Sequence, residues 1–134
     1  MKKQILILLL SILLITFSLS ANSSVLLNEI LANGLNDPES EWIELFNNEN
    51  SDINLTTWNM SESSSKNFTL NTVIPANSFI ILAGDSKTFN STYPNVNASG
   101  IKIINITISN FNLADTSGEV RIYNSSGVLV DSIA

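Results

Sequence analysis

The chain contains no cysteine and no histidine among its 134 residues. Thiolate nucleophiles, thiolate or imidazole zinc sites and histidine-based catalytic triads are therefore excluded. Disulfide bonds are excluded as well, so the folded domain depends on its hydrophobic core alone. Because most familiar enzyme mechanisms need one of these two residue types, we predict that the chain is not an enzyme and uses no cofactor.

Basic residues are also scarce, with six lysines and arginines against twelve acidic residues. Lys2 and Lys3 lie in a separate N-terminal segment, and the rest of the chain carries four basic and twelve acidic residues, a net charge of −8. An acidic surface repels phosphate and anionic membranes, and it lacks the basic stripe that provides most nucleic-acid affinity. We expect no nucleic-acid partner for this domain alone.

The N-terminus has the three-part pattern of a secretory signal peptide. Lys2 and Lys3 precede a largely apolar run over residues 5–19, and small residues follow it. We predict a signal peptide over residues 1–21 and a secreted or cell-surface protein. An uncleaved membrane anchor is the alternative, in which case this segment is the only contact with a membrane. Its apolar run is shorter than the about 20 residues that usually span a bilayer.

Beyond this segment, short apolar runs alternate with clusters of Asn, Ser, Gly and Pro, which is typical of strands and turns. The clearest run extends from Glu41 to Asn47. Its alternation places Ile43 and Leu45 on one face, while bulky side chains also occupy the other face. This pattern predicts a central strand that is covered fully on one side and partly on the other.

Eight strands are expected in total. The predicted segments are 25–31, 41–47, 53–60, 68–70, 79–83, 101–108, 120–123 and 128–133. The inward phase slips between Leu55 and Trp58, which indicates a β-bulge. Pro75 is expected at the second position of a turn, and Gly127 in the left-handed position of a hairpin loop. No window of 11 or more residues shows helical periodicity, so the sequence predicts one all-β sandwich domain over residues 22–134.

The order of several motifs resembles that of the lamin-tail domain family in its exported prokaryotic form. The matching segments are 27–30, 41–47, Leu55 with Trp58, 74–75 before 79–83, 112–115, 120–124 and 126–132. The resemblance covers residues 25–134 and implies an immunoglobulin-like antiparallel β-sandwich with Trp58 in its core. It also implies an interaction module rather than a catalyst, of a kind that accompanies nucleases or adhesive repeats in exported proteins.

Acidic residues gather around Pro38. Asp37, Glu39 and Glu41 occupy alternate positions in an oxygen-rich loop, and such loops can hold Ca²⁺. The spacing lacks the glycine and the terminal glutamate of a helix-loop-helix calcium site. A solvated loop is therefore the favoured interpretation, with these three residues as the candidate ligands if calcium binds.

Glu29 and Glu44 fall on strands that are expected to be neighbours. Two carboxylates about 5–10 Å apart across a cleft are the catalytic residues of a typical glycoside hydrolase. The favoured alternative is structural, with both glutamates accepting hydrogen bonds from loop backbone or from Arg121 or Lys102. A sandwich face offers no obvious cleft for a sugar.

Aromatic residues provide another candidate site. Trp58 is assigned to the core, whereas Phe89 and Tyr93 lie in the long segment from Gly84 to Gly100. Loops of this length are uncommon and often functional. If the protein binds a glycan or protein partner through a loop, we expect Phe89 and Tyr93 to take part.

Asn-x-Ser/Thr sequences are abundant, and composition alone accounts for roughly half of them. In a host with the machinery for it, a glycoprotein is expected. The acceptors on predicted loops or outward strand positions are Asn67, Asn90, Asn97, Asn105 and Asn124.

Together these observations predict a non-catalytic, exported interaction or scaffolding module in cell-surface adhesion or targeting. The alternative is an accessory binding domain of a secreted hydrolase or nuclease, whose catalytic domain lies beyond residue 134.

Overall fold

The computed structural model describes residues 23–35, 39–62, 66–106 and 113–134. The predicted signal peptide, residues 1–21, lies outside these ranges. In the part of the chain that is described, no helix is long and apolar enough to cross a membrane.

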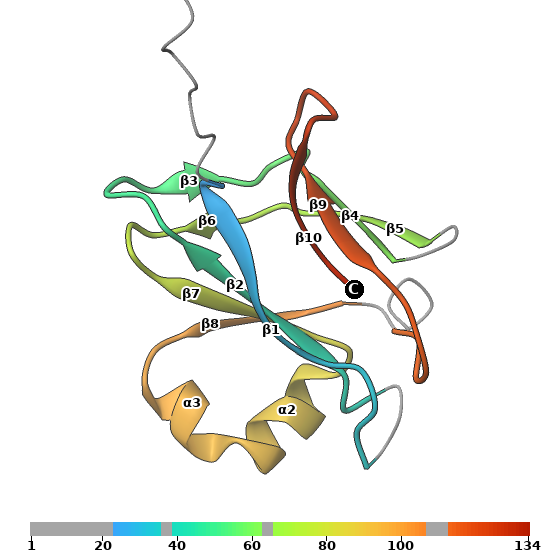
Figure 1. The fold of residues 1–134 in the computed structure, drawn as a ribbon. Coiled ribbons are helices and arrows are strands. Elements are labelled where there is room, and N and C mark those ends of the chain that lie inside the picture. The colour runs from blue at the N-terminus through green and yellow to red at the C-terminus, as the bar shows by residue number, and fades with distance from the viewer. Residues whose placement is uncertain (1–22, 36–38, 63–65, 107–112) are drawn as a thin grey trace, which may run out of the picture.

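Two four-stranded sheets pack against each other to form a β-sandwich (Figure 1). The first sheet has the order β1-β2-β7-β8 and contains β1 (Val25–Leu31), β2 (Trp42–Asn47), β7 (Phe79–Ala83) and β8 (Lys102–Asn105). The second has the order β10-β9-β4-β5 and contains β10 (Leu129–Ile133), β9 (Val120–Tyr123), β4 (Asn59–Glu62) and β5 (Lys66–Thr69). A small third sheet pairs β3 (Ile53–Asn54) with β6 (Val73–Ile74).

Strand β2 is central in the first sheet, as its alternation predicts. It pairs antiparallel with β1 on one side and with β7 on the other. Ile43 and Leu45 are fully buried on its inner face, whereas Trp42, Glu44 and Phe46 on the outer face are half-buried. Because β2 has strands on both sides, its register fixes the positions of the surrounding core residues.

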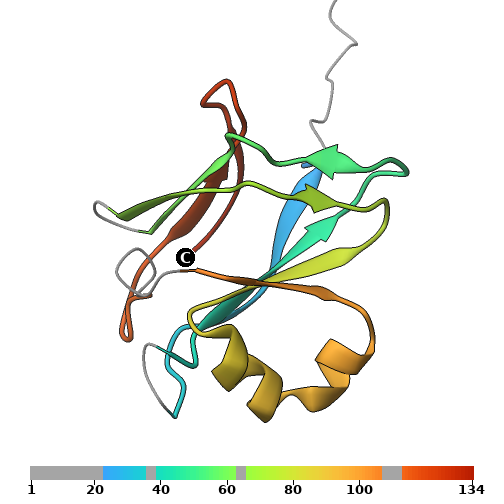
Figure 2. The same cartoon turned by 180° about the vertical axis from the view of Figure 1, so that it is seen from behind.

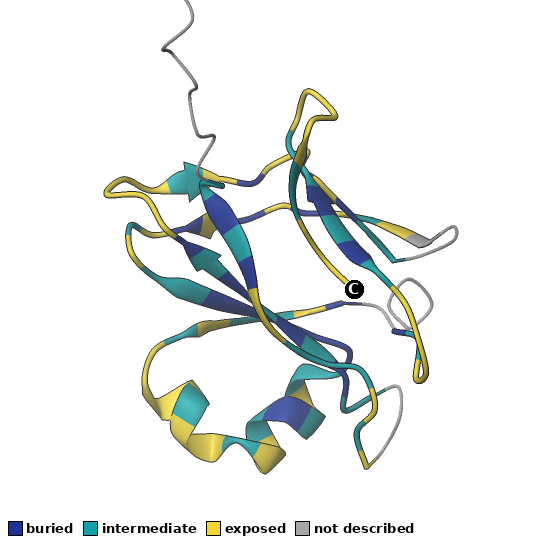
Figure 3. Cartoon of the chain, viewed as in Figure 1, coloured by how far each residue is buried: buried dark blue, intermediate teal, exposed yellow. Residues whose placement is uncertain are grey.

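The core fills the space between the two sheets, where Figure 3 shows the buried segments in dark blue. Full burial of each large aliphatic side chain contributes about 1.5–3 kcal/mol. No disulfide supplements these contacts, because the chain has no cysteine. The core consists of Val25, Leu27, Ile43, Leu45, Leu55, Trp58, Met60, Leu70, Ile74, Ile80, Leu82, Ile106, Leu113, Val120 and Ile122.

The predicted bulge between Leu55 and Trp58 is wrong. A tight turn separates β3 from β4 at this point, with the Trp58 N–H donating to the Leu55 carbonyl over 2.9 Å and Thr57 in the left-handed region at φ 70°. The turn reverses the phase, so that Leu55 and Trp58 are both buried. One predicted strand is therefore two short strands in different sheets.

The predicted loop from Gly84 to Gly100 also differs from expectation, because it contains two helices, α2 (Ser86–Thr92) and α3 (Pro94–Ala98). They connect β7 to β8, which are parallel to each other, and parallel neighbours need such a crossover. Both helices lie on the outer side of the first sheet (Figures 1 and 2). Each is too short to give periodicity over 11 residues.

Two turns were predicted with different success. Gly127 has φ 74° and closes the β9–β10 hairpin, as expected, with its N–H donating to the Asn124 carbonyl over 2.9 Å. The turn near Pro75 lies one residue later than predicted and is centred on Ala76 and Asn77. Asn77 has φ 49°, and asparagine tolerates this left-handed conformation better than most residues.

Candidate functional site

The edge strands β1 and β10 face each other where the two sheets meet, and we call this junction the seam. At one end of it, Ser23 Oγ donates to the Val130 carbonyl over 2.5 Å and the Leu27 N–H donates to Asp131 Oδ2 over 2.8 Å. Both strands have an irregular register at this place, between Leu27 and Glu29 in β1 and between Leu129 and Asp131 in β10. Hydrogen bonds that involve the side chains of Ser23 and Asp131 therefore join β1 and β10 at this end. The two strands belong to different sheets and do not pair as neighbours there.

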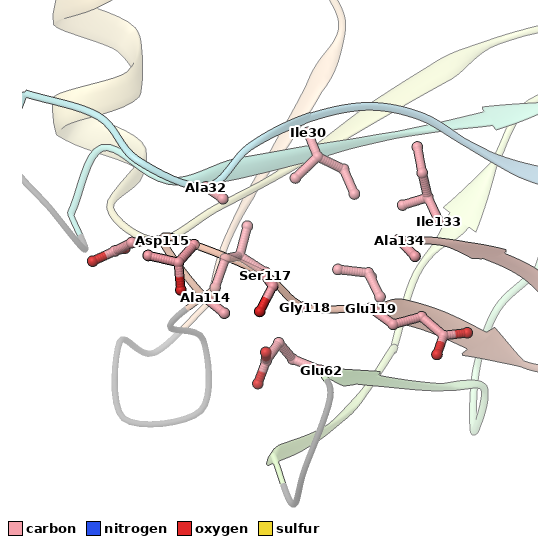
Figure 4. A pocket seen from close by; sticks show the side chains of 13 residues that line it. Ile30, Ala32, Glu62, Ala114, Asp115, Ser117, Gly118, Glu119, Ile133 and Ala134 are labelled. Carbon is pink, nitrogen blue, oxygen red and sulfur yellow. The ribbon is translucent and has the colours of Figure 1, made fainter.

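The other end of the seam contains a cavity of about 280 Å³, which we call the seam cavity (Figure 4). Ile30 of β1, Ile133 of β10 and Val120 of β9 form the apolar part of its lining. Acidic and hydroxyl side chains complete the lining from β4 and from the segment before β9. These are Glu62, Asp115, Thr116, Ser117 and Glu119.

The carboxylates of the seam cavity differ in their partners. Glu119 forms an ion pair with Arg121, and the side-chain hydrogen bond between them raises the pKa of Arg121 above its ordinary value. Among the described side chains, which do not include that of Lys66 opposite Glu62 in β5, the carboxylates of Glu62 and Asp115 have no hydrogen-bond or ion-pair partner. Two carboxylates besides that of Glu119 thus line this cavity.

A second cavity, of about 360 Å³, lies between α2 and the connection from β1 to β2. It brings together Phe89 and Tyr93, the two aromatic residues expected to bind a partner, along with the hydroxyls of Thr88 and Thr92. Phe89 is only 4% exposed, so most of its surface is committed to packing.

The packing of Phe89 holds the helices on the outer face of the first sheet. Phe89 forms a second buried cluster with Ile81 and Ala83 of β7. The indole of Trp42 contacts the rings of Phe89 and Tyr93 edge-on, with centroid distances of 5.9 and 6.0 Å. Such geometry is favourable for aromatic pairs. Tyr93 is half-buried and therefore retains the larger accessible surface of the two.

Glu29 and Glu44 are direct partners on adjacent strands, as expected from their positions. Glu44 accepts a hydrogen bond from Asn28 Nδ2 over 2.6 Å, and Glu29 is exposed. The expected donors contribute nothing here, because Arg121 pairs with Glu119 and Lys102 Nζ donates to Thr72 Oγ1. Neither glutamate lines the seam cavity or the cavity beside α2.

The structure describes two of the three candidate calcium ligands. Asp37 lies outside the described residues, and Glu39 is half-buried in a turn. Glu41 is fully buried and its Oε2 accepts a hydrogen bond from the Leu113 N–H over 3.0 Å. Over the described ranges, no three acidic side chains gather as a metal site would require.

A model of the lamin tail domain family matches residues 18–134 of this chain, which is most of its length. The chain belongs to the lamin tail domain family. A search of curated proteins finds no match. The family is an immunoglobulin-like, non-enzymatic domain family, in agreement with the sandwich and with the resemblance of the motifs. Trp58 is 9% exposed and lies in the core of this lamin tail domain, where the resemblance places it.

The five candidate glycosylation sites of the lamin tail domain occupy different environments. Asn67 and Asn97 are exposed, and their side chains form no hydrogen bond within the described part of the chain. Asn105 Oδ1 accepts from the Ser86 N–H at the start of α2, and Asn124 Oδ1 accepts from two N–H groups of the hairpin loop. Asn90 is half-buried. Asn67 and Asn97 are therefore the most accessible acceptors.

Sequence reasoning missed that both ends of the inner face of β2 are polar. Glu41 and Asn47 continue the alternation of Ile43 and Leu45 and are both fully buried. Asn47 Nδ2 donates to the carbonyls of Ser51, Ile74 and Pro75 over 2.9–3.1 Å. The alternation itself was the available signal, because it places residues 41 and 47 on the inward face.

Proposed function

We propose that this lamin tail domain is an exported, non-catalytic interaction module that acts at the cell surface in adhesion or in targeting. The observation that carries the proposal is the signal-peptide pattern over residues 1–21, directly before a domain of a non-enzymatic family. The partner is a protein or a glycan outside the cell.

The chemistry of the two cavities supports binding rather than catalysis. Acidic, hydroxyl and aliphatic side chains line the seam cavity, and aromatic, hydroxyl and amide groups line the cavity beside α2. The net charge of −8 beyond residue 21 disfavours nucleic acid and anionic lipid as partners.

Binding of the labelled, secreted chain to intact cells of its host tests this function. We expect saturable binding that an excess of unlabelled chain displaces. Absence of saturable binding, together with retention of the chain inside the cell, would contradict the proposal.

A further inference from the structure

The lining of the seam cavity contains carbon and oxygen but no side-chain nitrogen (Figure 4). Its oxygens belong to three carboxylates and two hydroxyls, and no basic or amide side chain is among its lining residues. Because the carboxylates accept hydrogen bonds and carry negative charge, the complementary group is a cationic donor. Among the described side chains, none pairs with the carboxylates of Glu62 and Asp115, which can therefore accept hydrogen bonds from a ligand.

A bare metal ion fits this arrangement poorly. Hard cations need six or more oxygens that converge on one point, and no three acidic side chains of the described residues do so. The cavity walls from Ile30, Val120 and Ile133 are also apolar. The seam cavity therefore combines apolar walls with acidic side chains. This combination suits an aliphatic side chain that ends in a cation, as in lysine or arginine.

The size of the cavity supports a single side chain as its occupant. Its volume of about 280 Å³ lies just below the usual range for sites of whole small ligands, about 300–1,000 Å³. A second copy of this acidic chain is disfavoured as the partner, since like charges repel.

The strands around the cavity show how a peptide backbone would be held. β1 and β10 are the edge strands of their sheets, and the bonds of Ser23 and Leu27 join them only at the far end of the seam. Ile30 and Ile133 flank the cavity where those bonds end. Edge strands bind extended peptides through backbone hydrogen bonds, while pockets for alternate side chains provide specificity.

We propose that the seam cavity binds a lysine or arginine side chain from an extended segment of a partner protein. The inference rests on the proposed function as an interaction module and names the chemistry of its partner. The aliphatic stem packs between Ile30, Val120 and Ile133, and the cationic end reaches Glu62 and Asp115.

Peptide titration of the ¹⁵N-labelled, secreted chain tests the proposal. The probe is a capped peptide of alternating threonine and valine with one central lysine, and the comparison peptides have norleucine or glutamate in its place. We expect the lysine peptide to shift the amide signals of Ile30, Gly118 and Ile133. Norleucine keeps the stem without the charge and is expected to weaken binding about threefold or more.

Variants of the protein make the second arm of the test. Glu62→Gln with Asp115→Asn is expected to weaken binding of the lysine peptide about threefold to tenfold. The matched control, Glu29→Gln with Glu49→Gln, removes the same charge from exposed acids outside the cavity and is expected to change the affinity less than about twofold. If the first double variant does not fold, the norleucine comparison on the unaltered chain decides.

The proposal would be overturned if the lysine and glutamate peptides bind equally well, or if the folded Glu62/Asp115 variant keeps its affinity for the lysine peptide. It would also be overturned if the lysine peptide shifts none of the amide signals. The outcome is separable from the broader function. If the secreted chain binds cells but does not bind the lysine peptide, the seam cavity is not the binding site for a basic side chain. The proposed function as an interaction module is then still supported. If the chain is not exported and binds no cells, the proposed function fails whatever the peptide does.

Discussion

Glu41 Oε2 accepts a hydrogen bond from the backbone N–H of Leu113, 72 residues further along the chain. Both residues are buried, with Glu41 fully so and Leu113 3% exposed. Leu113 belongs to the connection between the first sheet and β9 of the second. The hydrogen bond thus links the residue before β2 to the segment that connects β8 of the first sheet with β9 of the second.

Replacing Glu41 with alanine is expected to lower the free energy of unfolding by about 1–3 kcal/mol, because the buried Leu113 N–H loses its acceptor. Glu41→Gln keeps an acceptor oxygen and is expected to cost less. Urea unfolding of the two variants measures the difference. Equal stabilities of the alanine variant and the unaltered chain would contradict a structural role for Glu41.

Asn47 supports the connection before β7, and its removal is expected to destabilise the fold. Its amide donates to the carbonyls of Ile74 and Pro75, and the bond with the fully buried Ile74 is itself buried. Asn47→Ala is expected to lower the free energy of unfolding by about 1–3 kcal/mol. The neighbouring Asn48→Ala is the control, because Asn48 is exposed and should change stability by less than about 0.5 kcal/mol.

Asp85 caps α2, and the stability that it provides is expected to depend on pH. Its Oδ1 accepts from the Thr88 N–H over 2.7 Å, and this backbone hydrogen bond lowers the pKa of Asp85 below the ordinary value of 3.8. Since the folded pKa is depressed, the contribution is complete above pH 3.8 and is lost as the pH falls through the folded value.

Thermal unfolding of the Asp85→Ala variant beside the unaltered chain checks this expectation. The difference between their midpoints is expected to be constant near neutral pH and to shrink in acid. A difference that grows as the pH falls below 3.8 would have the wrong sign for a depressed carboxyl pKa.

Phe89 is expected to matter for stability more than for ligand contact. It is 4% exposed and packs on Ile81 and Ala83, so Phe89→Ala is expected to cost about 3–5 kcal/mol in urea unfolding. Tyr93→Phe removes only a hydroxyl from the cavity beside α2 and should leave stability nearly unchanged. Little change for Phe89→Ala, with weakened cell binding, would restore the interpretation of Phe89 as a contact residue.

Strand positions are predictable from the sequence where short apolar runs are bounded by clusters of turn residues. The bounds of β1 and β7 agree with prediction, and the inward face of β2 was assigned correctly from Ile43 and Leu45. The face of β2 follows from the two-residue period, whereas β7 is a nearly continuous apolar run. The family of the chain also followed from the order of these segments.

Features that depend on distant partners were not readable. The helix that carries Phe89 is seven residues long, and it is stabilised by the Asp85 cap and by contact with β7 rather than by its own periodicity. In the sequence, the turn between Leu55 and Trp58 cannot be distinguished from a β-bulge. A turn and a bulge each place two inward-facing residues out of the two-residue phase. The seam cavity joins residues from positions 30 to 134, and no local pattern predicts such a meeting.

The mass of the chain recovered outside the cell tests export most directly. Expression of the whole chain with a C-terminal tag is expected to give an external product that lacks residues 1–21 and retains residues 22–134. A full-length chain that remains in the cytoplasm with its first 21 residues intact would contradict an exported interaction module.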